Sequence, residues 1–245
     1  MADPDPADAA GAPSPAHSNL TLRIISSMVL APFALVVAYV GGIAFALFWT
    51  IAASIVLWEW TRLVKGARLE GGRFAGWLAA GVVYAGILLA APLMLRRDPA
   101  LGFAAILFVF AVVWMTDIAA YFAGRAIGGP KLLPAVSPKK TWSGAIGGTL
   151  GGIAAALLVA KMAGLVLAPM LVLVALGLSI VAQAGDLLES AIKRHFGAKD
   201  AGQLIPGHGG LMDRLDGFLT AAAAAVMLGL LRGGLEGPSR GLLVW

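Results

Sequence analysis

The chain has 245 residues, of which 60% are hydrophobic and 13% are charged, and its mean hydropathy is +0.88. Soluble domains carry about 25% charged residues, so this composition indicates an integral membrane protein. Cysteine is absent from the sequence, which excludes disulfides, thiolate metal sites and cysteine nucleophiles. We attribute the net charge of +5 to basic cytoplasmic loops and expect no nucleic-acid partner.

Residues 1–19 are predicted to form a disordered N-terminal tail. They are rich in Ala, Pro and Asp and lack Lys and Arg, so they do not resemble a signal peptide. We expect the rest of the chain to comprise N-terminal transmembrane helices (20–116), a transmembrane region that carries the catalytic site at its cytoplasmic face (117–232), for the reasons given below, and a C-terminal tail (233–245).

The hydrophobic segments predict an all-α fold, a polytopic membrane bundle of about seven transmembrane helices, since a span needs about 20 apolar residues. The expected spans are 22–40, 43–61, 75–95, 100–122, 143–163, 166–189 and 217–232. No alternation typical of a membrane barrel is present, and a helix is the other structure that satisfies the backbone in lipid.

The distribution of Lys and Arg predicts the orientation of the bundle. The 62–74, 123–142 and 190–216 loops are basic, and all three lie on one side if seven spans alternate. That side should be the cytoplasm, with the N-terminus inside and the C-terminus outside. Arg96 and Arg97 would lie outside, as exceptions to the rule. We expect a multi-pass protein of the bacterial cytoplasmic (inner) membrane.

The end of the sixth span carries five polar residues at helical spacing. Asp186, Glu189, Ser190, Lys193 and Arg194 fall at i, i+3, i+4, i+7 and i+8, which places them on one helix face. One interpretation is a row of salt bridges at the membrane interface. The other is a functional site, because charged groups near hydrocarbon are costly.

A glycine-rich loop, 204–210, follows this helix and precedes the last span. Its backbone amides, together with the start of a helix near Asp213, could bind phosphate. Asp213 and Asp216 would share a face of that helix and supply oxygen ligands for Mg²⁺. Helix capping is the alternative role for these two carboxylates.

A third polar group lies at the end of the fourth span and in the loop after it. Asp117, Tyr121 and Arg125 are spaced i, i+4, i+8, and an aspartate within an apolar stretch is a candidate functional residue. Lys139 and Lys140 follow, close to a glycine-rich helix start. Such a pair is either a topology signal or part of a triphosphate-binding site.

These segments resemble the phosphatidate cytidylyltransferases (CDP-diacylglycerol synthases). The stretch S-A-I-K-R-x4-K-D-x-G-x2-I-P-G-H-G-G-L-M-D-R-L-D matches that family's signature, and D-I-A-A-Y-F-A-G-R and S-P-K-K-T-W resemble its upstream motifs. The similarity covers about 117–220. Ser143 departs from the family pattern, which commonly has Glu there, and the family often has more N-terminal spans.

The resemblance implies transfer of CMP from CTP to phosphatidic acid, with Mg²⁺ as cofactor and a second cation left open. CTP, phosphatidic acid and membrane lipids are then the partners, and a homodimer is left open. The residues proposed as catalytic are Asp186, Lys193, Arg194, Asp213 and Arg214. Those proposed as metal ligands are Asp186, Asp213 and Asp216. Those proposed to bind substrate are Asp117, Tyr121, Arg125, Lys139, Lys140, Ser190, Lys199, Asp200, Gly207, His208, Gly209 and Gly210.

Two rival functions were considered. A CDP-alcohol phosphatidyltransferase requires A-R and further aspartates after its D-x2-D-G, and this chain has Thr220-Ala221 and no later Asp. An ion-coupled transporter of an anionic solute remains the alternative, although it predicts charges near the middle of the spans.

Overall fold

The computed structural model describes residues 15–67, 69–202, 204 and 209–245. The helices are α1 (Pro15–Val40), α2 (Gly42–Gly66), α3 (Gly71–Arg96), α4 (Gly102–Ile127), α5 (Trp142–Met162), α6 (Pro169–His195), α7 (Met212–Gly233) and α8 (Pro238–Leu243). Two short strands, β1 (Lys131–Leu133) and β2 (Ser137–Thr141), form an antiparallel hairpin between α4 and α5. The predicted all-α architecture is confirmed for the long elements, and the hairpin was not predicted from the sequence.

Every expected span coincides with a helix. Helices α2 to α7 are each long and apolar enough to cross a membrane, and α1 adds a shorter apolar stretch, Met28–Val40. Two differences concern the ends. Helix α1 begins at Pro15, so it includes the last residues assigned to the disordered tail, and the C-terminal tail contains the short helix α8.

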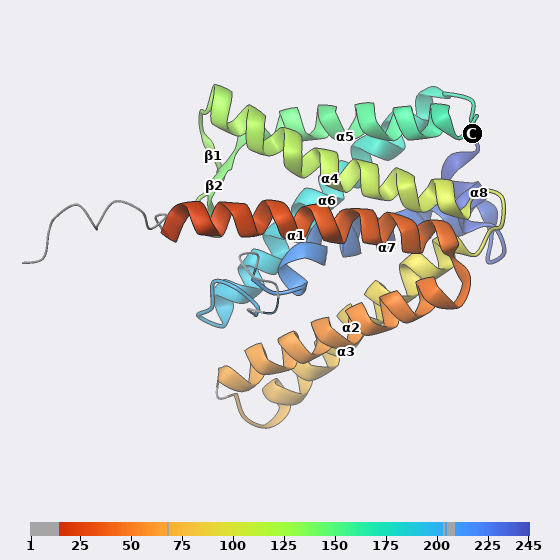
Figure 1. Cartoon of the computed structure of the whole chain (residues 1–245). Helices are drawn as coiled ribbons and strands as arrows, with labels where there is room; N and C mark the ends of the chain where they lie inside the picture. Colours follow the sequence, from red (N-terminus) through yellow and green to blue (C-terminus); the bar gives the residue numbers. More distant parts are fainter. Residues whose placement is uncertain (1–14, 68, 203, 205–208) are drawn as a thin grey trace, which may run out of the picture.

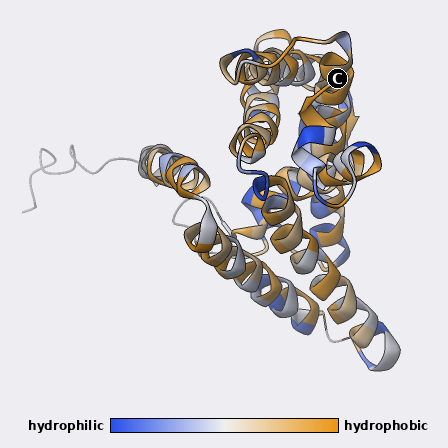
Figure 2. Cartoon of the chain, turned by 90° about the vertical axis from the view of Figure 1, so that its right-hand side faces the viewer, coloured by the Kyte–Doolittle hydropathy of each residue, from blue (hydrophilic) through white to orange (hydrophobic). Residues whose placement is uncertain are grey.

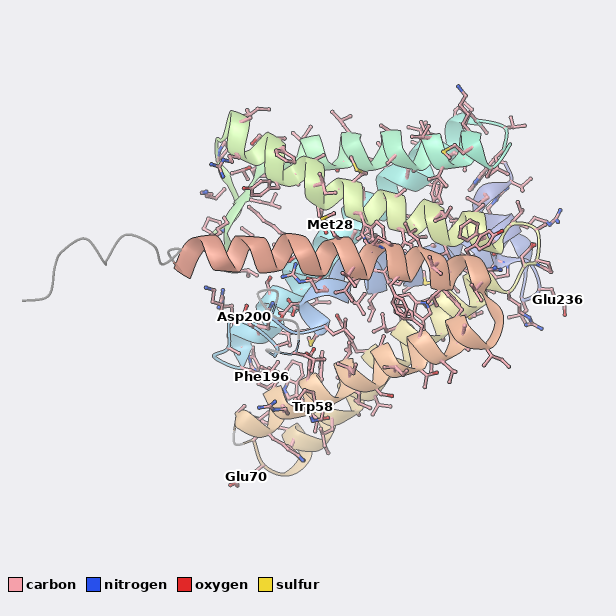
Figure 3. All side chains as sticks on the ribbon, viewed as in Figure 1. Met28, Trp58, Glu70, Phe196, Asp200 and Glu236 are labelled. Carbon is pink, nitrogen blue, oxygen red and sulfur yellow. The ribbon has the colours of Figure 1, made fainter. Side chains whose placement is uncertain are left out.

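The three basic loops lie at one end of the bundle (Figure 1). This end, called the basic end below, holds the start of α1, the α2–α3 connection, the β-hairpin and the α6–α7 connection. The C-terminus lies at the opposite, distal end. In Figure 3, Glu70 and Asp200 accordingly lie at the basic end and Glu236 at the distal end. The three basic loops, predicted to lie on one side, therefore do lie at the same end of the bundle.

Helix α4 packs most extensively against α5, and the glycines of α5 explain why the two helices approach so closely. A Cβ built on Gly147 would lie 2.4 Å from the Ala123 Cβ, and one on Gly148 would lie 2.6 Å from the Thr116 carbonyl oxygen. Small residues allow such contacts in membrane bundles. The glycine-rich start of α5 therefore serves helix packing.

Aromatic side chains join the remaining helices around Phe218 of α7. Its ring stacks on Trp49 of α2 with the centroids 4.9 Å apart, and it lies 5.1 Å from the Phe110 ring of α4. Helices α2 and α3 form a hairpin that extends away from α4 and α5 at the basic end (Figure 1). Hydrophobic residues dominate the long helices, and hydrophilic residues are confined to short stretches (Figure 2). This arrangement leaves the polar end of α6 between the two helix pairs.

Candidate active site

Helix α6 continues to His195, so the five polar residues predicted to share one helix face do so. Glu189 and Lys193 are buried, whereas Asp186 and Ser190 are half-buried and Arg194 is exposed. Ser190 Oγ lies 3.4 Å from Asp186 Oδ1. Arg194 donates a hydrogen bond of 3.1 Å to the Ala198 carbonyl oxygen, which closes the end of the helix. The face therefore runs from a buried ion pair to accessible groups.

Lys193 lies between two carboxylates. Its Nζ is 2.5 Å from Asp213 Oδ1 and 2.6 Å from Glu189 Oε2. The three side chains are 11%, 7% and 1% exposed, respectively. Among the described residues the Glu189 oxygens accept no hydrogen bond of good geometry, so the ion pair alone compensates their burial. We call Glu189, Lys193 and Asp213 the Lys193 cluster.

Carboxylates also occupy the start of α7. Asp213 accepts hydrogen bonds from the backbone N–H groups of Gly210 (2.8 Å) and Ala201 (3.1 Å). The next two amides, of Leu211 and Met212, donate to Glu59 of α2 at 3.0 and 2.8 Å. Capping was the alternative considered for Asp213, but Leu211 is the N-cap residue of α7, and the two amides that Asp213 accepts from precede the helix. Its oxygens therefore tie the α6–α7 connection to the first turn of α7. Of the backbone expected to bind phosphate, the amides of Gly210, Leu211 and Met212 are thus occupied by carboxylates of the protein.

A second group of charges is more accessible. Lys140 Nζ lies 2.5 Å from Asp186 Oδ2, and the two side chains are 27% and 31% exposed. Asp117 of α4 lies within electrostatic range of both, and Asp216 of α7 within range of Asp186 and Asp117. We call Asp117, Lys140, Asp186 and Asp216 the accessible cluster. It draws on α4, β2, α6 and α7, the elements in which the sequence placed the site.

The β-hairpin fixes Lys140 in this cluster. Strand β2 ends at Thr141, whose Oγ1 accepts a hydrogen bond of 3.1 Å from the Gly144 amide and so caps α5. Ser143, which departs from the family pattern, donates to the Gly128 carbonyl oxygen and lies 3.1 Å from Thr141 Oγ1. The serine therefore ties the start of α5 to the end of α4.

No group of three or more carboxylate or imidazole side chains in the described part of the chain is arranged to hold a metal ion. Asp213, one of the three expected ligands, is engaged by Lys193 and by two backbone amides. Asp216 Oδ1 accepts a hydrogen bond of 2.7 Å from the adjacent Gly217 amide, and the two oxygens of Asp186 contact the accessible groups Ser190 and Lys140. Mg²⁺ commonly uses one or two protein carboxylates together with substrate phosphate. The accessible cluster can provide such carboxylates.

The other predicted site residues lie around these clusters. Arg125 donates a hydrogen bond of 3.0 Å to the Tyr121 hydroxyl, and both side chains are exposed at the end of α4. Gly209 lies against Asp213. Four further residues are exposed at the basic end: Lys139, Lys199, Asp200 and Arg214. Gly207 and His208 lie outside the described residues.

Sequence reasoning did not include Glu59 among the site residues. The residue is fully buried in α2 and bonds to the start of α7. A carboxylate within an apolar span is a candidate functional residue on its own, and this signal was present in the run Leu57-Trp58-Glu59-Trp60. Its partner was not predictable, because the contact joins residues more than 150 positions apart.

Comparisons with known proteins agree with these observations. The model of the cytidylyltransferase family matches residues 70–231, a range that contains both clusters. A phosphatidate cytidylyltransferase of Brucella suis biovar 1 is 42% identical, with 87% of this chain and 94% of the relative covered. One of Staphylococcus epidermidis is 47% identical over 48% of this chain and 46% of the relative. The chain belongs to the cytidylyltransferase family.

Proposed function

We propose that this multi-pass membrane protein transfers CMP from CTP to phosphatidic acid, giving CDP-diacylglycerol and pyrophosphate for phospholipid biosynthesis. The observation that carries the proposal is the similarity, over 87% of this chain, to a protein named phosphatidate cytidylyltransferase. The family match also includes every residue of the Lys193 cluster and of the accessible cluster. The chemistry of these residues suits a reaction between two anionic phosphates.

In the proposed reaction an oxygen of the phosphatidic acid phosphate attacks the α-phosphorus of CTP. A bond forms between that oxygen and the α-phosphorus, and the bond to the bridging oxygen of the β-phosphate breaks, so pyrophosphate leaves. No protein nucleophile is required. Catalysis of this kind depends on alignment of the reactants and on neutralisation of their charge.

We propose that basic residues in and around the accessible cluster neutralise the charge of the phosphates. Lys140 is half-buried beside Asp186 and can exchange this partner for a phosphate of CTP, with Lys139 next to it on β2. Arg194 and Arg125 end α6 and α4 at the basic end, where the phosphate of a lipid would lie. Lys193, by contrast, is enclosed by two carboxylates. We assign it the role of holding Asp213.

We propose Mg²⁺ as the cofactor, held by Asp186 and Asp216 with Asp117 nearby. The two clusters together hold five carboxylates against three basic residues, Lys140, Lys193 and Arg214, so negative charge is in excess. When bound, Mg²⁺ would neutralise phosphate oxygens and orient the triphosphate. Asp213 was expected to be a ligand, but its partners in this structure favour a structural role.

We propose that the basic end faces the cytoplasm of a bacterial cell and that the protein resides in the inner membrane. Support comes from the positive charge of the loops at that end and from the bacterial origin of the relatives. A homodimer would form through lipid-facing surfaces such as the exposed side of α1 with Phe33, Val36 and Tyr39. Cross-linking in native membranes tests that assembly.

The test of the activity uses purified protein in detergent with phosphatidic acid, Mg²⁺ and CTP labelled in the cytidine. The expected result is a labelled lipid together with release of pyrophosphate, and Asp216→Asn serves as the inactive control. A preparation that labels no lipid contradicts the proposal. Labelled solute uptake into proteoliposomes without lipid labelling would favour the transporter instead.

A further inference from the structure

A carboxylate outside the family match contacts the candidate active site. Glu59 of α2 precedes residue 70, where the match begins. Its side chain is 0% exposed, and its two oxygens accept hydrogen bonds from the Leu211 and Met212 amides at 3.0 and 2.8 Å. These amides immediately precede Asp213. Glu59 therefore contacts the segment that presents both aspartates of α7.

The backbone of the α6–α7 connection encloses the Glu59 carboxylate. A Cβ built on Gly202 would lie 2.7 Å from Glu59 Oε1, and one on Gly210 would lie 2.8 Å from the same atom. Neither glycine has a positive φ. A methyl group at either position would therefore have to displace the Glu59 carboxylate. The carboxylate fits between two parts of the connection and holds them at a fixed separation.

No basic side chain among the described residues forms an ion pair with Glu59. A buried carboxylate without a cation is costly unless it is hydrogen-bonded. Here the amides at the start of α7 supply those hydrogen bonds, and the positive end of the helix dipole adds to them. Glu59 occupies a position that could otherwise attract a phosphate.

We infer that Glu59 is a positioning residue for the transfer reaction. It fixes the first turn of α7 against α2, so that Asp213 contacts Lys193 and Asp216 lies near Asp186 and Asp117. The inference rests on the proposed function, since the reaction is the process being positioned. It gives the α2–α3 hairpin a role in catalysis although α2 contributes no residue to either cluster.

The first test compares Glu59→Gln with Glu70→Gln, which changes an exposed glutamate at the same end of the bundle. The NH₂ group of the Gln side chain cannot accept a hydrogen bond, so it would face one of the two backbone N–H donors and displace the start of α7. A misplacement of about 1 Å can reduce a rate about a hundredfold. We expect the kcat of Glu59→Gln to fall about tenfold to a hundredfold, with little change in the KM for CTP or phosphatidic acid. Glu70→Gln should resemble the wild type.

The second test uses the packing around the carboxylate and does not remove it. Gly202→Ala places a methyl group against Glu59 and should lower kcat, whereas Glu59→Asp withdraws the carboxylate by one methylene. In the Glu59→Asp background, Gly202→Ala should therefore have little further effect. Equal effects of Gly202→Ala in both backgrounds overturn the inference, even if Glu59→Gln proves too unstable to purify.

A third measurement is independent of activity. The chain has no cysteine, so Leu204→Cys, at an exposed position, provides a single attachment point for a spin label. We expect the label to move faster in Glu59→Gln than in the wild-type background. Identical spectra, or a kcat of Glu59→Gln equal to that of wild type, refute the inference. If the wild type labels no lipid, the proposed function fails, and the spectra still decide whether Glu59 positions the segment.

Discussion

Replacement of Lys193 by methionine separates a positioning role from direct substrate binding. The change removes the cation between Glu189 and Asp213 and leaves two carboxylates that are only 1% and 7% exposed. Removal of one partner from a buried ion pair costs about 3–5 kcal/mol. In a chain of this length each kcal/mol lowers the melting temperature by about 2–4 °C. We therefore expect Lys193→Met to melt on the order of 10 °C below the wild type.

The melting temperature can be followed in detergent by the fluorescence of the seven tryptophans. Lys161→Met, which changes an exposed lysine at the end of α5, is the matched control and should melt like the wild type. Glu189→Gln added to Lys193→Met should restore part of the loss, since it removes one uncompensated charge. A melting temperature unchanged by Lys193→Met, combined with a raised KM for phosphatidic acid, would refute this reasoning and make Lys193 a substrate ligand.

Three further predictions concern the remaining parts of the site and the fold. Asp216→Asn should abolish turnover and leave the melting temperature near that of the wild type. Asp213→Asn should lower both turnover and melting temperature, because it breaks contacts with Lys193 and two amides. Equal melting temperatures of the two variants would contradict this division of roles. Lys140→Ala should raise the KM for CTP at least fivefold, with a smaller effect on the KM for phosphatidic acid. If initial-rate kinetics show the larger effect on the KM for phosphatidic acid, Lys140 binds the lipid and not CTP. Gly148→Val should destabilise the protein by about 1–3 kcal/mol, because its Cβ would press on the Thr116 carbonyl oxygen; unchanged thermal stability would show that α4 and α5 separate freely.

The sequence by itself determined the membrane helices, but not the β-hairpin or the short helix α8. Hydrophobic runs of about 20 residues leave a helix as the way to satisfy the backbone in lipid, so the six long apolar helices and the shorter apolar stretch of α1 followed from composition. The local spacing of Asp186, Glu189 and Lys193 also followed, because the period of the helix fixes which residues share a face. The motifs between Asp117 and Asp216 indicated the family to which the chain belongs.

Only the tertiary structure decided which charged group pairs with which. Lys140 and Lys193 are both lysines of the predicted site, yet one lies in the accessible cluster and the other is enclosed by carboxylates. Asp213 and Asp216 share a helix face, yet the first is held by Lys193 and the Gly210 amide and the second lies within electrostatic range of Asp186. Glu59 reaches α7 from α2. Such pairings depend on distances between helices that are far apart in the chain. Hydropathy and helical period predict a helix and its faces, but they do not predict which helices pack next to it.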